Sequence, residues 1–180
     1  MSTLVRLAHH RWALPVLAEL LSASGGRFVN LTHSLGVSRE SLRRTLNALE
    51  IDGLIQRNPG HGHPLRPEYL LTAAGERLAE PSRVVIDLLA DLQVIEVGLR
   101  KWSLPILDAL AEDRLRYSEL RNALPGTTPR ALTLALKDLE AAGLVSREVT
   151  TSYPPTTSYG TTARAVPIAL AAGRLARAVS

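Results

Sequence analysis

The stretch that decides the fold is residues 128–147, TPRALTLALKDLEAAGLVSR. Its start favours a helix, because the Thr128 hydroxyl can accept a hydrogen bond from a first-turn amide and Pro129 suits the first helical position. Gly143 supplies the left-handed residue that commonly ends a helix. One face carries an apolar stripe of Leu132, Leu136 and Leu139. The stretch therefore predicts a short helix that packs on a core through its leucines.

The opposite face of this predicted helix carries Arg130, Thr133, Leu134 and Lys137. A short helix with a leucine core face and a small, basic outer face suits insertion into a DNA major groove. Leu134 is the exception among the outward residues. It can meet either a thymine methyl group or another protein.

The same pattern occurs 90 residues earlier, in residues 38–57, SRESLRRTLNALEIDGLIQR. Ser38 takes the capping position of Thr128, and Gly53 takes the position of Gly143. The apolar stripe falls on Leu42, Leu46 and Leu49, and the outward residues are Glu40, Arg43, Arg44 and Asn47. The chain is therefore a tandem repeat, and we expect two domains, residues 1–92 and 93–180.

Composition excludes several classes of protein. The 180 residues carry a formal net charge of +4, which is a modest bias toward polyanions such as nucleic acids. The chain has no cysteine, so disulfides, thiol redox sensing and cysteine-based metal sites are excluded. There is no apolar run long enough to span a bilayer and no signal-peptide layout, so we expect a cytoplasmic protein without membrane contact.

Each half also predicts a helix before the repeated stretch. Residues 3–9 form a short apolar helix or turn, and helices follow Trp12 and Trp102, which we expect to be core anchors. Short extended segments at 27–31 and 116–120 then turn into helices. Those helices end at Leu35 and Leu124, with tight turns at Gly36 and Gly126. Helix, turn and capped helix is the order of a helix-turn-helix motif.

After each capped helix the composition predicts a β-hairpin. Turn-forming residues occupy 58–64 and 150–155, and the flanking segments 54–57 and 68–71 alternate as paired strands do. A hairpin directly after the second helix of this motif is a wing. The fold class is therefore mainly α with small β wings (α+β), with two winged helix-turn-helix domains.

The connection between the halves is expected to be helical. Thr72 can cap a helix whose apolar stripe continues from Glu76 to Leu99, interrupted or restarted at Pro81, and a thinner Ala-rich helix occupies residues 168–179. Since no flexible linker separates the halves, we expect these helices to join them as a pseudo-dimer within one chain. The alternative is a true homodimer with four DNA-binding heads.

These motifs resemble the HxlR-type family of bacterial winged-helix transcription regulators. The resemblance rests on Lys101-Trp102 and Arg11-Trp12, on residues 27–31 and 116–120, on residues 132–147, and on the closing motif of residues 69–75. Most of that family has one such domain per chain and dimerises through terminal helices. This chain has two domains, and its second closing motif, residues 159–165, lacks the Leu and Gly of the first.

The candidate DNA contacts are the caps, the outward residues of both helices, and basic or histidine residues of the wings. Arg and Asn can read guanine and adenine edges bidentately, and wing residues can meet phosphates or the minor groove. They are Ser38, Arg39, Arg43, Arg44, Asn47, Arg57, His61, His63 and Arg66 in the first half, and Thr128, Arg130, Thr133, Lys137 and Arg147 in the second. A purely solvated face, with Glu40 paired to Arg44, is the alternative.

Other chemistry finds little support. His61 and His63 lie in a Gly/Pro-rich turn without a ligand-spaced carboxylate or cysteine, so we expect no metal. No phosphate-binding glycine loop or nucleophile elbow is present, so we expect neither an enzyme nor a cofactor. The main hypothesis is a sequence-specific regulator that binds double-stranded DNA. Its rival is a tandem winged-helix module that binds protein.

Overall fold

The computed structural model describes residues 3–23, 25–58, 68–151, 153 and 155–178. The first half contains α1 (Thr3–Ala8), α2 (Ala13–Ser22), β1 (Gly26–Arg27), α3 (Phe28–Leu35), α4 (Arg39–Ile51), β2 (Ile55–Asn58), β3 (Glu68–Leu71) and α5 (Ala73–Asp91). The second contains α6 (Ile95–Gly98), α7 (Ser103–Ala109), β4 (Leu115–Arg116), α8 (Tyr117–Ala123), α9 (Pro129–Ala141), β5 (Val145–Val149), β6 (Thr157–Thr161) and α10 (Val166–Arg177). The predicted fold class is confirmed.

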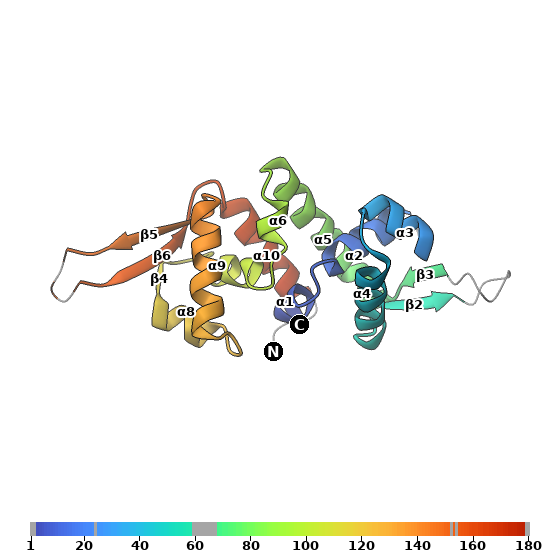
Figure 1. Ribbon diagram of the computed structural model, residues 1–180, viewed down its shortest axis with the longest axis horizontal. Coiled ribbons are helices and arrows are strands. Elements are labelled where there is room, and N and C mark those ends of the chain that lie inside the picture. Colours follow the sequence, from blue (N-terminus) through green and yellow to red (C-terminus); the bar gives the residue numbers. More distant parts are fainter. Residues whose placement is uncertain (1–2, 24, 59–67, 152, 154, 179–180) are drawn as a thin grey trace.

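The molecule is elongated, with a hairpin at each end (Figure 1). Each half has a small antiparallel sheet, of order β1-β3-β2 in the first and β4-β6-β5 in the second. The hairpin registers are equivalent, since Arg57 faces Tyr69 and Arg147 faces Tyr159. Helices α4 and α9 stand toward the viewer between the two hairpins (Figure 1). The predicted wings are therefore present, directly after the predicted helices.

The extended segments expected at 27–31 and 116–120 are shorter than predicted. Only β1 and β4 are extended, and helices α3 and α8 begin at once. In the second half the Glu119 carboxylate accepts a hydrogen bond from the Arg116 backbone amide at 2.6 Å. That bond satisfies an amide at the start of α8, which allows the helix to begin immediately after the strand.

Gly53 and Gly143 follow the ends of α4 and α9, as the sequence predicted. Gly53 and Gly143 both have φ of +68°, in the left-handed region. After α9, the Gly143 amide donates to Glu140 and the Leu144 amide donates to Leu139, each at 2.9 Å, which is the Schellman arrangement. The first half repeats both bonds after α4. Helices α4 and α9 therefore end in the same geometry, and β2 and β5 begin at the same distance along the chain after them.

The helix predicted from Glu76 to Leu99 differs in two ways. α5 runs through Pro81 without a break, and it stops at Asp91. The stop is a Schellman arrangement built without glycine, since Gln93 takes φ of +56° and the Val94 amide donates to Leu89 at 2.9 Å. Val94 and Leu89 are both buried in the hydrophobic core, so the segments on either side of this turn are held by packing. The connection is thus two helices joined by a tight turn after Asp91, whereas the interruption was expected at Pro81.

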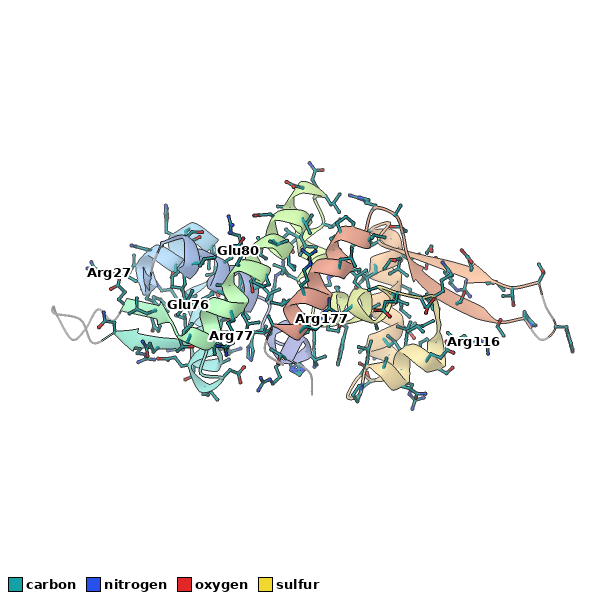
Figure 2. All side chains as sticks on the ribbon, turned by 180° about the vertical axis from the view of Figure 1, so that it is seen from behind. Arg27, Glu76, Arg77, Glu80, Arg116 and Arg177 are labelled. Atoms are coloured by element: carbon teal, nitrogen blue, oxygen red, sulfur yellow. The ribbon has the colours of Figure 1, made fainter. Side chains whose placement is uncertain are left out.

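The halves share one hydrophobic core. α5 packs on α2 and on α10, and α1 reaches across to α7 and α10. Figure 2 shows α5, which carries Glu76 and Glu80, beside α10, which carries Arg177. The buried residues form a single cluster that contains both leucine stripes, and Trp102 is buried within it. The packing of α5 on α10 fixes the two halves relative to each other.

The second hairpin packs through an exchange of large and small residues. In the first half Gly25 faces Leu70, and a Cβ at Gly25 would lie 2.6 Å from the Leu70 side chain. In the second half the equivalent of Leu70 is Gly160, and Arg114 fills the space. The Arg114 guanidinium donates to the Ser146 hydroxyl at 2.9 Å and pairs with Glu148 at 3.2 Å. The altered closing motif is therefore compensated from a distant segment.

The same motif explains why α10 begins late. The Gly75 backbone in α5 approaches the Leu54 carbonyl so closely that a Cβ there would lie 1.9 Å from the oxygen. The residue 90 positions later is Ala165, which precedes α10 in a turn. α5 begins at Ala73 and α10 only at Val166, three residues later than the repeat would place it. The extra methyl group of Ala165 is accommodated outside the helix.

Candidate nucleic-acid interface

Helices α4 and α9 are held in equivalent positions by their caps and leucines. The Ser38 hydroxyl accepts from the Ser41 amide and the Thr128 hydroxyl accepts from the Ala131 amide, each at 3.2 Å. Both helices contain 13 residues, with the predicted leucines buried on one face: Leu42, Leu46 and Leu49 in α4, and Leu132, Leu136 and Leu139 in α9. Their opposite faces are left to solvent. The predicted orientation of both helices is confirmed.

The exposed face of α4 carries an ion cluster. The predicted residues Arg39, Arg43, Arg44 and Asn47 are all exposed. The Glu40 carboxylate accepts a hydrogen bond from the Arg43 guanidinium and another from Arg44 Nε, the latter at 2.8 Å. These bonds, that from Arg43 first, hold the pKa of the Glu40 carboxyl below its usual value of 4.5. Glu40 therefore stays ionised at neutral pH and fixes both guanidinium groups.

The exposed face of α9 has different chemistry. Arg130, Thr133 and Lys137 are exposed, as predicted, and the Leu134 side chain is 59% exposed. The Tyr117 hydroxyl, from α8, donates to the Pro129 carbonyl at 2.9 Å and lies 3.4 Å from the Thr133 hydroxyl. This contact ties the start of α9 to the preceding helix. The face offers two separated cations around a threonine and a leucine.

Two of the predicted wing residues, Arg57 and Arg147, lie among the described residues. Arg57 on β2 pairs with Glu50 at 2.9 Å and lies over the Tyr69 ring at 5.7 Å, and hydrogen bonding to Glu50 raises its pKa above the ordinary value. Arg147 on β5 is exposed. The remaining predicted wing residues, His61, His63 and Arg66, lie outside the described residues.

Two hollows flank the helices, and the sequence indicated neither. One, of about 790 Å³, lies between residues 9–12 and α4, and its lining includes His10, Arg44 and Asn47. The other, of about 320 Å³, lies between α9 and the second hairpin, and its lining includes Lys137 and Arg147. The first hollow forms where the segment before α2 packs beside α4, and the second where the hairpin packs beside α9. Tertiary packing therefore forms the walls of both hollows.

His9 lies beside the first hollow, at the contact between the halves. Its ring meets the edge of the Trp102 ring, with 6.3 Å between the ring centres. Burial lowers the pKa of His9, and electrostatic repulsion from Lys101 and from His10 lowers it further. Over the part of the chain that the structure describes, no group of three or more His, Asp or Glu side chains is placed to hold a metal ion.

Two segments of the chain, residues 7–93 and 97–173, match the sequence profile of the HxlR-like helix-turn-helix family. The chain belongs to this family. The two matches together leave out only the ends of the chain and a few residues at the α5–α6 turn, so each copy contains one capped helix and one hairpin. The HxlR-like resemblance drawn from the motifs is therefore confirmed, in both halves.

Named relatives of this HxlR-like protein are regulators. Over 69 residues it is 39% identical to an HTH-type transcriptional regulator of Methanothermobacter thermautotrophicus, covering 38% of this chain and 52% of that one. Over 71 residues it is 38% identical to the HTH-type transcriptional regulator sll1512 of Synechocystis, covering 39% of this chain and 53% of the other. The chain thus spans about half the length of these relatives.

Among solved structures, the redox regulator HypR in its oxidized form is 33% identical, over 45% of this chain and 87% of HypR, with a TM-score of 0.42. The HxlR-like chain itself contains no cysteine. In the described residues, no helix combines the length and the apolarity that crossing a membrane requires.

Proposed function

We propose that this HxlR-like chain is a transcriptional regulator that binds double-stranded DNA with two recognition helices and two wings. The observation that carries the proposal is the repeated unit itself. In both halves a capped helix buries its leucines, exposes polar or basic residues, and leads directly into a hairpin. A major groove admits such a helix, and the neighbouring wing is then placed for backbone or minor-groove contact.

The outward residues divide by chemistry into two roles. Arg43, Arg44 and Asn47 have the donors and acceptors that recognise base edges in the major groove. Contacts with the DNA phosphate backbone are assigned to the helix caps, Ser38 and Thr128, and to the cations Arg39, Arg57, Arg130, Lys137 and Arg147. Thr133 lies between Arg130 and Lys137 on α9. The wing residues His61, His63 and Arg66 remain predicted backbone or minor-groove contacts.

We further propose that one chain provides the arrangement that a dimer usually supplies, with domains 1–92 and 93–180 paired through α5 and α10. The shared core supports this, because separating the halves would expose both helices. Arg164 adds a polar tie, donating to the carbonyls of Leu92 and Ala142. Sedimentation should find the 19.5 kDa monomer. A species of twice that mass with no monomer would contradict the pseudo-dimer.

Binding to random duplex DNA at increasing salt tests DNA recognition. Five phosphate contacts would give a slope of log affinity against log salt of about −4.5. Raising salt from about 50 to about 200 mM would then weaken binding roughly 500-fold. An affinity independent of salt would contradict DNA binding.

A protein-interaction module is the second candidate, and a specific observation favours it. Leu134 is 59% exposed on α9 and Val149 is 55% exposed on β5. Exposed apolar groups can mark a protein contact when they form a patch. The same salt series separates the two candidates, because an apolar protein contact lacks the counterion release that makes DNA affinity fall.

A further inference from the structure

The two recognition helices can be compared position by position. α4 and α9 have the same length, and every residue of α4 has its equivalent 90 positions later in α9. Their caps and buried leucines occupy equivalent positions, so the two helices present equivalent faces outward. Differences between the outward residues are therefore differences in what each helix offers to DNA.

At four equivalent outward positions, the side chains of α4 and α9 differ in charge or polarity. An acid, Glu40, stands where α9 has the cation Arg130, and Arg44 stands where α9 has the exposed Leu134. The other two pairs are Arg43 with Thr133 and Asn47 with Lys137. On α4, Glu40 holds two guanidinium groups side by side, which suits guanine edges. On α9, the threonine and leucine methyl groups suit thymine methyl groups.

The two hollows lie on different sides of their helices, and on each side an ion pair is present in only one half. On the side of the helix away from the wing, Arg100 pairs with Asp138 in the second half. The equivalent positions in the first half are His10 and Ala48, which form no such pair and line the hollow of about 790 Å³.

On the wing side the order is reversed. Arg57 pairs with Glu50 at 2.9 Å in the first half. Their equivalents, Arg147 and Glu140, line the hollow of about 320 Å³, and in the described part of the chain no ion pair joins them. The hollow beside α4 is therefore on the side away from its wing, and the hollow beside α9 is on the side of its wing.

We propose that the chain recognises a non-palindromic operator and binds it in one orientation, with a guanine-containing half-site under α4 and a thymine-containing half-site under α9. The inference rests on the proposed DNA-binding function. A homodimer presents two identical helices and reads a palindrome. Here the shared core fixes two unlike helices in one order, so reversing the chain on its site would mismatch both half-sites. Each lost bidentate contact weakens binding by about 5- to 150-fold.

Selection of binding sites from a random duplex pool tests the inference. The wild-type chain should select a site whose halves differ. A symmetrised variant carries the α4 residues on α9, as Arg130→Glu, Thr133→Arg, Leu134→Arg and Lys137→Asn, and should select a palindrome of the α4 half-site. The converse variant, Glu40→Arg, Arg43→Thr, Arg44→Leu and Asn47→Lys, should select a palindrome of the other half-site. All eight positions are exposed, so both variants should keep the helical circular dichroism of the wild type.

Orientation is measured directly, because the chain has no cysteine of its own. An iron chelate attached through Thr151→Cys, an exposed position beyond β5, should cleave the selected site on one side only. A wild-type palindrome, cleavage on both sides, or a symmetrised variant that keeps the wild-type site would overturn the inference while DNA binding stands. Failure to enrich any duplex would overturn the proposed function and the inference with it.

Discussion

Replacing Glu40 by Gln should weaken sequence discrimination while strengthening non-specific DNA binding. The Glu40 carboxylate accepts from Arg43 and from Arg44 Nε, the latter at 2.8 Å, so it both fixes and partly neutralises two cations on the outer face of α4. Gln keeps the size and the helix propensity of Glu but removes its charge. The two guanidinium groups would then be free to approach phosphates in any register.

The size of the effect follows from the number of cations released. Each added phosphate contact steepens the slope of log affinity against log salt by about 0.9, so two released arginines steepen it by about 1 to 2. Fluorescence anisotropy with a labelled random duplex, at salt from about 50 to about 200 mM, measures this slope. The ratio of specific to random affinity should fall in the same titration.

The matched control is Glu80→Gln. Glu80 makes a similar exposed ion pair with Arg83 at 2.7 Å on α5, and its carboxyl pKa is likewise lowered by hydrogen bonding to Arg83. Figure 2 shows it on the opposite side of the molecule from the view in which α4 and α9 stand forward. This variant should leave both slope and discrimination unchanged. If Glu40→Gln behaves like Glu80→Gln, the carboxylate does not control the arginines on α4.

Two further predictions concern stability. Gly75→Ala places a Cβ 1.9 Å from the Leu54 carbonyl oxygen, so it should cost about 1–3 kcal/mol or more in chemical denaturation. Gly173→Ala meets only side-chain atoms, at 3.1 Å or more, and should cost less; equal losses would refute the backbone clash. Because the pKa of His9 is lowered by burial and by Lys101, the unfolded chain binds its proton more readily, and acidification through pH 6.5 should destabilise the fold. His9→Gln should reduce the fall in Tm between about pH 7.5 and about pH 5.5, and an unchanged fall would exclude His9 as a cause.

The candidate interface was predictable where the signals are local. Outward positions on α4 and α9 follow from helical periodicity, so the exposure of Arg43, Asn47 and Lys137 could be read from spacing alone. Spacing predicted the pair of Glu40 with Arg44 at i,i+4 but not the additional pair with Arg43 at i,i+3. Either partner is within reach of the carboxylate, and spacing does not indicate that both bind it at once. The two hollows could not be anticipated, since their walls come from segments that only tertiary packing brings together.

The sequence by itself determined where the helices begin and end and which faces they bury. Ser38 and Thr128 cap, Gly53 and Gly143 take left-handed φ, and these are local requirements that a residue meets or fails within one turn. Only the tertiary structure decided where a residue adopts a backbone conformation that its own side chain disfavours. Gln93 holds φ of +56° because the next residue, Val94, is buried and its amide bonds to the carbonyl of Leu89.

The exchange between Arg114 and Gly160 belongs to the tertiary structure for the same reason. The altered closing motif of the second half looks defective when it is read alone, because a missing side chain implies a missing contact. The space is filled by a guanidinium from 46 residues earlier, whose nitrogen would lie 2.6 Å from a Cβ at Gly160. Local periodicity carries no information about such a distant partner, and packing of α5 on α10 likewise depends on surfaces that exist only after both helices have formed.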